Sequence, residues 1–191
     1  MTWNHSACQF TDALASSNPT PGGGAAAAMA GAMGCALIQM AASTTLKRKS
    51  TPSEYRPLLE KSLQELKTLH EQLKNLMTQD ATAYETYLTA AKLPKEDSSR
   101  TQAIQEALWQ AACVPAQTAQ ICQTVLAQLK TVQPYISHII ISDVHCAQHL
   151  LGSALACCVE NIRANAAYIT DPTRQGKLRE FIGKFSSGNT L

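Results

Sequence analysis

Two aspartates lie where a carboxylate could do chemistry, each beside other polar side chains on an expected helix. Asp80, Tyr84 and Tyr87 fall at steps of four and three residues, so one helix face carries all three. Spacing alone fits a solvated helix edge as well as it fits a site. Asp143 follows Ser142 near the expected start of another helix, where an acidic residue can also be a simple cap. Either carboxylate could stabilise a positive charge or move a proton.

Two asparagines on the helix that follows Asp143 are candidates for contact with a polar ligand. Asn161 and Asn165 are four residues apart and therefore share a face. Alanine, leucine and cysteine surround them, so their amides are expected to be buried and to need hydrogen-bond partners. These amides could bridge two helices or orient a ligand.

A proline- and glycine-rich segment runs from Pro19 through Pro21, Gly22 and Gly23 to Gly24 and opens directly into a helix. The N–H groups at such a helix start, together with the helix dipole, favour anions. The segment lacks the ending of a P-loop and the spacing of a dinucleotide fingerprint. A tight connection, in which glycine only lets two backbones approach, explains it equally well.

His145 and His149 are four residues apart with Cys146 between them, a spacing that can bind zinc. The glutamate of an HExxH motif is missing, and no third ligand is obvious from the sequence. We therefore expect no metal site.

The elements that must position these residues are expected to be helices almost throughout. Apolar residues recur at helical spacing, and Pro115 should kink or restart one helix. Residues 136–141 are the only strand-like run. The sequence predicts an all-α, single-domain antiparallel bundle of six or seven helices over residues 1–191, with a loose tail at 186–191. The expected helices span about 6–16, 25–43, 54–91, 99–132, 142–168 and 173–185.

Composition narrows the class of protein. The 191 residues are 45% hydrophobic but only 5% aromatic, so the core should be built from small and aliphatic side chains that let helices approach closely. A net charge of +2 argues against a nucleic-acid or membrane partner. The Ala- and Gly-rich stretch 25–42 is interpreted as a buried helix. Seven cysteines, and a start without a basic segment followed by an apolar run, favour a reducing cytoplasmic setting.

Four blocks of sequence, in order, resemble the cyclodeaminase part of the formiminotransferase-cyclodeaminase family, which includes stand-alone methenyltetrahydrofolate cyclohydrolases. Each block alone is weak, but four in order over about residues 10–168 are specific. The blocks are Ala15 to Ala25; Asp80-Ala81-Thr82-Ala83-Tyr84 with Ala91-Lys92-Leu93-Pro94-Lys95; Ile104-Gln105-Glu106-Ala107-Leu108 with Val114-Pro115; and Ser142-Asp143 with Asn161-Ile162-Arg163-Ala164-Asn165.

The resemblance implies an all-helical homodimer that acts on tetrahydrofolate derivatives without a cofactor. The implied reaction is hydrolysis of methenyltetrahydrofolate to formyltetrahydrofolate, or cyclisation of formiminotetrahydrofolate with release of ammonia. Both reactions involve a cationic, amidinium-like carbon that a carboxylate would stabilise. Asp143 is the first catalytic candidate and Asp80 the second.

The resemblance also suggests how the rest of a folate could be bound. The substrate, possibly polyglutamylated, carries carboxylates for the glycine-rich helix start and for the cations that end the same helix. Tyrosines could stack on its rings, and asparagines could bind the pterin edge. The implied substrate-binding residues are Pro21, Gly22, Gly23, Gly24, Lys47, Lys49, Tyr84, Tyr87, Lys92, Ser142, Asn161 and Asn165.

Two stretches depart from the family pattern. Leu46-Lys47-Arg48-Lys49-Ser50 replaces a run like GKKKY, and Val132-Gln133-Pro134-Tyr135 stands in place of GNPN. Two other functions therefore stay open beside the enzyme. The chain could be a relative that binds folate without turnover, or a structural helical protein whose glycine-rich turn only packs.

Overall fold

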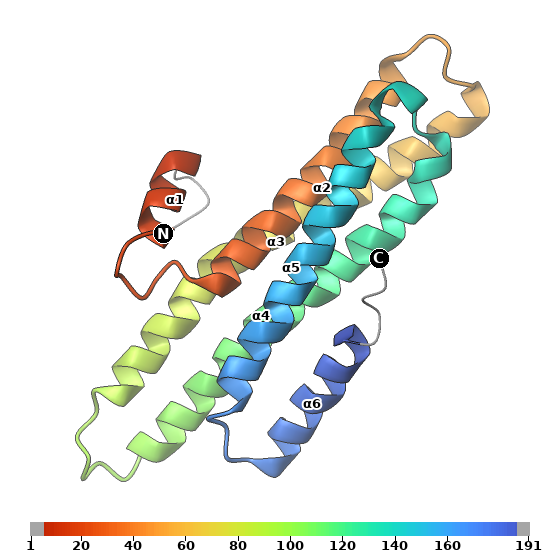
Figure 1. Cartoon of the computed structure of the whole chain (residues 1–191). Helices are drawn as coiled ribbons and strands as arrows, with labels where there is room; N and C mark the ends of the chain where they lie inside the picture. Colours follow the sequence, from red (N-terminus) through yellow and green to blue (C-terminus); the bar gives the residue numbers. More distant parts are fainter. Residues whose placement is uncertain (1–5, 187–191) are drawn as a thin grey trace.

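The computed structural model describes residues 6–186, and four long antiparallel helices form the body of the molecule (Figure 1). Within this range there are six α-helices and no strand, so the predicted all-α antiparallel bundle is confirmed. The tail predicted to be loose lies outside the described residues, apart from its first residue. The α-helices are α1 (Ala7–Leu14), α2 (Gly23–Lys47), α3 (Arg56–Ala91), α4 (Arg100–Val132), α5 (Ile141–Ala166) and α6 (Pro172–Ser186).

Helix α2 packs along α3 and α5 and also contacts α4. Small residues line all of its faces, which lets its backbone approach its neighbours. A Cβ atom added at Gly31 would lie 2.7 Å from Sγ of Cys122, and one at Gly34 would lie 2.9 Å from Cγ of Leu151. The backbone of α2 therefore contacts α4 and α5 directly.

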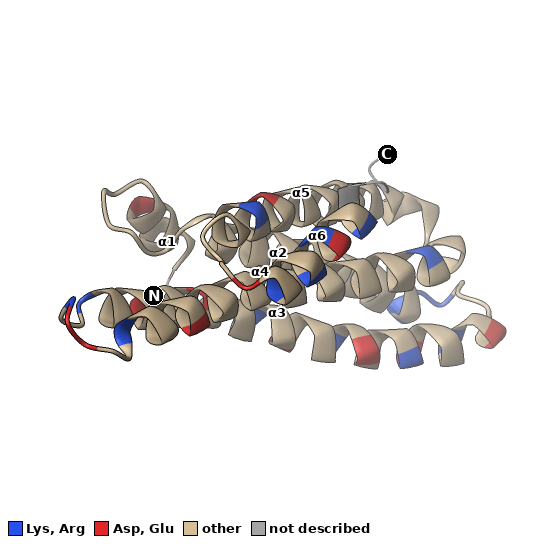
Figure 2. Ribbon diagram, turned by 90° about the horizontal axis from the view of Figure 1, so that it is seen from below, with Lys and Arg blue, Asp and Glu red and all other residues tan. Residues whose placement is uncertain are grey.

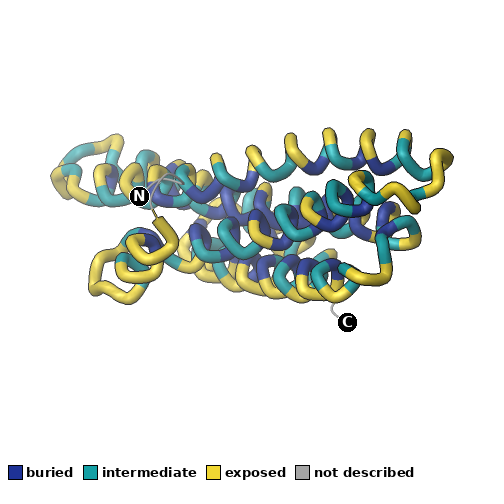
Figure 3. Tube along the Cα trace, turned by 90° about the horizontal axis from the view of Figure 1, so that it is seen from above, coloured by how far each residue is buried: buried dark blue, intermediate teal, exposed yellow. Residues whose placement is uncertain are grey.

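Leucines at helical spacing bury one face of α3, as the sequence pattern predicts. Leu59, Leu66 and Leu73 are fully buried against the core. At about 1.5–3 kcal/mol for each buried leucine, this stripe is a major part of the contact between α3 and α2. The alternation of buried and exposed positions along the long helices is visible in Figure 3.

Two places with a local preference against a helix are decided by the structure. Pro115 does not restart the helix, because α4 continues through it as one helix, although this proline cannot donate a backbone hydrogen bond. Pro115 is buried, and the packing of α4 against α3 and α5 offsets the lost bond. The strand-like run at residues 136–141 contains a 3-10 turn, η3 (His138–Ile140), because it connects two helix ends and has no strand to pair with. Two further turns are η1 (Ser53–Tyr55) and η2 (Gln133–Tyr135).

The two short helices at the ends of the chain pack on the outside of the bundle. Phe10 of α1 is buried beside Leu76 and Met77 of α3. Leu178 of α6 is buried beside Ile162 of α5. Figure 1 shows α1 beside the start of α2 and α6 beside the second half of α5. All seven cysteines are free thiols.

Two segments of the described chain are long and apolar enough to cross a bilayer by length and composition alone. In α2, 56% of the apolar window is buried in the protein, as expected for the core helix of a bundle. In the segment His138–Ala166, which contains α5, only 22% of the window is buried. Most residues of this window are therefore not buried within one copy of the chain.

Candidate functional site

The carboxylate of Asp80 lies against the start of α2. Its Oδ2 accepts a hydrogen bond from the backbone N–H of Ala25, at 2.9 Å. The first N–H groups of a helix lack partners within the helix, and they lie at the positive end of the helix dipole. The anion at the glycine-rich helix start is thus the protein's own carboxylate, and its second oxygen, Oδ1, is not used by Ala25.

Glycines make room for this contact. A Cβ atom at Gly24 would lie 2.0 Å from Oδ1 of Asp80 and 2.6 Å from Cγ. A Cβ atom at Gly23 would lie 3.0 Å from Nδ2 of Asn161. Only glycine at position 24 lets α3 and α2 approach this closely. The turn before it, which includes buried Pro21 and the N-cap residue Gly22, fixes where α2 begins.

Asn161 and Asn165 lie near the same helix start, on the last turns of α5. The Nδ2 group of Asn165 donates to the carbonyl of Ala111 on α4, at 3.2 Å, and to that of Asn161, at 3.0 Å. Asn161 donates from Nδ2 to the carbonyl of Cys157. Asn165 therefore bridges two helices, which was one of the two roles open from sequence. The Oδ1 atoms of both side chains have no hydrogen bond among the described residues.

The environment of Asp80 makes ionisation of its carboxyl less favourable than it is in water. Burial raises the pKa of this carboxyl, and the hydrogen bond from Ala25 opposes the shift only in part. Burial is also the main cause that raises the pKa of the Cys158 thiol, with smaller contributions from neighbouring groups that include Asp80. Cys158 therefore stays a neutral thiol beside the carboxyl. Cys158 lies one helical turn before Asn161, and its sequence context alone does not distinguish it from the other cysteines.

The raised pKa predicts how Asp80 affects stability. A carboxyl whose pKa is higher in the folded state contributes stability below its unfolded pKa, about 3.9, and loses it as pH rises through the folded value. Asp80→Asn should therefore be at least as stable as the wild type near neutral pH, with the difference shrinking in acid. Urea unfolding of both proteins from pH 4 to pH 8 measures this difference. An Asp80→Asn variant that is less stable than the wild type at neutral pH would contradict the prediction.

The tyrosines and the lysine of the second sequence block follow Asp80 along α3. Tyr84 and Tyr87 have ring centroids 6.1 Å apart, and Tyr87 also packs in the apolar cluster that contains Ile162. Lys92 is the exposed C-cap of the helix, about 18 Å along the axis from Asp80. The structure thus brings Tyr84 and Tyr87 within two turns of Asp80 and leaves Lys92 at the helix end.

The remaining predicted site residues lie at the opposite end of the bundle. Asp143 is in the first turn of α5, about 27 Å along the helix from Asn161, and Ser142 precedes it. Lys47 and Lys49 are exposed where α2 ends, about 36 Å from its start. Within one copy of the chain, these residues do not share a site with Asp80.

This second end has a hollow of its own, of about 300 Å³. The two stretches that depart from the family pattern meet there, and Tyr55 packs edge-on against Tyr135 with centroids 4.9 Å apart. Hydroxyl groups and two basic side chains, Arg48 and His138, face it. A hollow with such a lining suits an anionic group.

Among residues 6–186, no group of three or more histidine, cysteine, aspartate or glutamate side chains that could hold a metal ion comes together around the histidine pair. His145 and His149 are both exposed on α5. Their four-residue spacing therefore reflects an outward-facing helix surface.

Comparison with known proteins gives the class to which this fold and site belong. The formiminotransferase-cyclodeaminase family matches residues 6–184, which is nearly the whole chain. The chain belongs to the formiminotransferase-cyclodeaminase family.

Individual relatives agree with this. A methenyltetrahydrofolate cyclohydrolase of Methylorubrum extorquens is 32% identical over 100% of this chain and 94% of its own length. A formimidoyltransferase-cyclodeaminase of Sus scrofa is 29% identical over 91% of this chain, which corresponds to 32% of that longer protein. The crystal structure of formiminotetrahydrofolate cyclodeaminase from Thermotoga maritima superposes with a TM-score of 0.86 at 27% identity, covering 96% of this chain and 89% of that one.

Proposed function

We propose that this chain is an enzyme that acts on the one-carbon bridge of a tetrahydrofolate, and that Asp80 is its central catalytic residue. The observation that carries the proposal is a carboxylate with a raised pKa, fixed at a helix start by Ala25 and Gly24 and close to polar groups of α5. Hydrolysis of methenyltetrahydrofolate is the first candidate reaction, because the cyclohydrolase relative matches over nearly its full length.

In the hydrolytic reaction, a water molecule adds to the cationic methenyl carbon between two folate nitrogens. Oδ1 of Asp80 accepts the proton that this water loses, while Ala25 holds Oδ2. One carbon–nitrogen bond then breaks, the released nitrogen takes up a proton, and the formyl group stays on the other nitrogen. Before the addition, the carboxylate also stabilises the positive carbon.

Formiminotetrahydrofolate cyclisation is the second candidate, favoured by the close structural match to the Thermotoga maritima cyclodeaminase. Here a folate nitrogen attacks the formimino carbon and ammonia leaves. A carboxyl with a raised pKa suits this reaction because it can give a proton to the departing nitrogen.

An optical assay tests the first reaction directly. Purified protein is mixed with methenyltetrahydrofolate, and the loss of its near-ultraviolet absorption band is compared with a control without protein. Ammonia release from formiminotetrahydrofolate tests the second. Failure of both reactions with protein that still binds folate in calorimetry would identify a binding protein without turnover, and absence of binding would favour a structural role.

We infer that Asp143 and Lys47, which lie at the end of the bundle opposite to Asp80, join its site from a second copy of the chain. Helices α2 and α5 lie side by side and leave Met33 and Met40 50% and 39% exposed. Residues 23–46 and 144–159 contain no aspartate, glutamate, lysine or arginine, and their histidines are His145 and His149. Accordingly, few residues of these two helices are coloured in Figure 2. We infer that this face, which carries small and apolar residues and two histidines but no acidic residue, lysine or arginine, packs against itself in a homodimer.

The antiparallel form of this dimer would complete the site. A two-fold axis across the middle of the face, near Cys35 of α2, places the two ends of the bundle beside each other. Asp80 and Asn161 of one copy then meet the partner's Asp143 and the partner's Lys47. The glutamate tail of the substrate would extend toward the hollow at the partner's second end, while the pterin lies near Asn161 and the paired tyrosines.

Subunit complementation tests this arrangement. Asp80→Asn and Asp143→Asn are each expected to be nearly inactive, since every site then lacks one carboxylate. Mixed after unfolding and refolding together, they should regain about a quarter of wild-type activity, because half of the dimers are mixed and one of their two sites is intact. A dimeric mass by sedimentation is the control. A mixture that stays inactive despite mixed dimers would contradict a shared site.

A further inference from the structure

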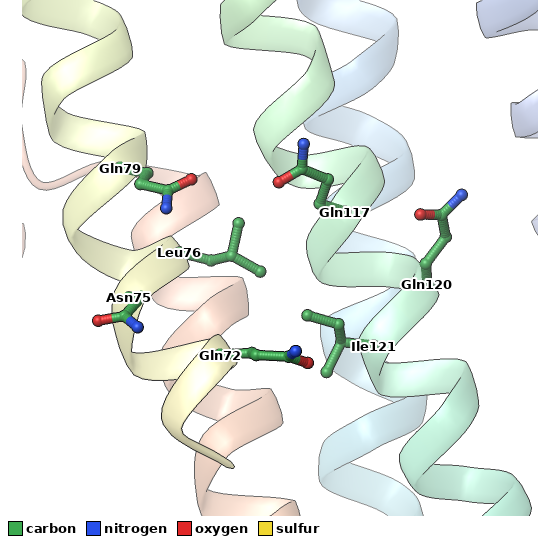
Figure 4. A pocket seen from close by; sticks show the side chains of 7 residues that line it. All are labelled: Gln72, Asn75, Leu76, Gln79, Gln117, Gln120 and Ile121. Carbon is green, nitrogen blue, oxygen red and sulfur yellow. The ribbon is translucent and has the colours of Figure 1, made fainter. Parts of the chain in front are cut away.

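A hollow of about 360 Å³ lies between α3 and α4 and has an unusual lining (Figure 4). Five of its seven residues carry carboxamides, and none is charged. The α3 residues follow helical spacing over two turns, and the α4 residues lie on one face. The lining consists of Gln72, Asn75, Leu76, Gln79, Gln117, Gln120 and Ile121.

The side chains are arranged as an apolar floor between two polar ends. Figure 4 shows Gln79 of α3 and Gln117 of α4 extending toward each other at one end, and Gln72 extending toward α4 at the other. Leu76 lies between these ends, and Ile121 lies across from Leu76 at the level of the Gln72 side chain. Gln72 and Gln79 are seven residues apart, about 10 Å along the helix. Leu76 is 3% exposed and packs in the cluster of Phe10, so the floor is held in place.

The amides of Gln72, Gln79 and Gln117 extend into the space between α3 and α4, whereas those of Asn75 and Gln120 extend away from it (Figure 4). None of the five makes a side-chain hydrogen bond with another of residues 6–186. The charged neighbours on α3, Glu71 and Lys74, are 2.8 Å apart and pair with each other. Each carboxamide offers an acceptor and two donors in one plane.

We propose that this hollow is a second small-molecule site, for an uncharged fused-ring heterocycle of the purine or pterin kind. Carboxamides pair with adjacent donor and acceptor atoms on the edge of such rings, as Asn and Gln do with adenine. The ring face rests on Leu76 and Ile121, while Gln79 and Gln117 bind one edge and Gln72 the other. The volume is at the lower end of the range for small-molecule sites. Phosphate- or carboxylate-bearing groups find no cation in the lining.

Titration with adenosine and, separately, with pterin tests the proposal and distinguishes the two sources of the ring. Calorimetry with the full chain should show binding of at least one of them. The side-chain amide signals of Gln79 and Gln117 should shift in the ¹⁵N NMR spectrum. The double variant Gln79→Ala/Gln117→Ala should bind at least tenfold more weakly, whereas the control Gln64→Ala/Gln102→Ala, which changes exposed amides on the same helices outside the hollow, should bind as the wild type does.

Three outcomes would overturn the proposal. The first is that neither compound binds. The second is that binding is the same in the Gln79→Ala/Gln117→Ala variant with its helical circular dichroism intact. The third is that Asp80→Asn abolishes binding while the amide signals of Gln79 and Gln117 stay in place, which would assign the ring to the Asp80 site. Because the wild-type amide signals report on the hollow directly, the test does not depend on how the variants fold or on any enzymatic activity.

Discussion

Replacing Asp80 by asparagine is expected to lower kcat/KM for methenyltetrahydrofolate by about 10²–10⁴-fold, the usual contribution of a general acid or base. The amide cannot accept the proton of the attacking water and carries no charge to stabilise the cationic carbon. It keeps the shape of the carboxyl and an oxygen that can accept the N–H of Ala25. The optical assay measures the loss as a ratio to the wild type.

Stability distinguishes a catalytic role of Asp80 from a structural one. Because burial raises the pKa of this carboxyl, the neutral amide should not lower the unfolding temperature at neutral pH. Glu71→Gln is a suitable control, since Glu71 is an exposed acid on the same helix that pairs with Lys74. If Asp80→Asn kept full activity, Asp80 would not be the central catalytic residue.

Gly24→Ala is expected to reduce activity nearly as much as the loss of Asp80 itself. The new methyl group would lie 2.0 Å from Oδ1 of Asp80, so the carboxylate must leave its position at the helix start. An alanine at an ordinary helix position would stabilise the protein by about 0.5–1 kcal/mol relative to glycine. Here the steric conflict should outweigh that gain and lower the unfolding temperature. Thermal unfolding and the optical assay measure the two effects.

Two further variants test whether the conflict with Asp80 causes the effects of Gly24→Ala. Gly176→Ala changes another helical glycine, in α6, where a Cβ atom meets nothing within 4 Å, so it should leave activity and folding intact. Gly24→Ala in an Asp80→Ala background should cost less stability than Gly24→Ala alone, because the conflicting side chain is gone. Additive costs would show that Gly24 and Asp80 do not interact, contrary to the geometry.

Helix periodicity was enough to predict the main body of the fold. The leucine stripe of α3 indicates a half-buried helix. The small residues on all faces of α2 indicate a helix that packs closely against several others. The local pattern was least informative at Pro115, which predicts a kink or a restart of the helix. Burial between neighbouring helices keeps α4 continuous around it.

The candidate site was predicted less completely, because distances between helices cannot be inferred from spacing along one helix. Asp80 and Asn161 were both named from sequence, yet nothing in the chain indicated that both lie against the glycines that start α2. The sequence predicts an anion of the substrate at the glycine-rich start, whereas the group that the structure places there is the carboxyl of Asp80. Asp143 lies at the opposite end, and its role stays a prediction that depends on a second copy.

The direct contact of the α2 backbone with Cys122 and Leu151 restricts how a sequence of this kind can diverge. A methyl group at Gly31 requires a smaller side chain at position 122, and one at Gly34 requires the side chain of position 151 to withdraw. A smaller side chain at position 122 or 151 alone lowers the stability of the protein, because it leaves a void beside the glycine. In homologous sequences, positions 31 and 122, and likewise positions 34 and 151, should therefore change together. Selection should remove most single substitutions at the glycines of α2.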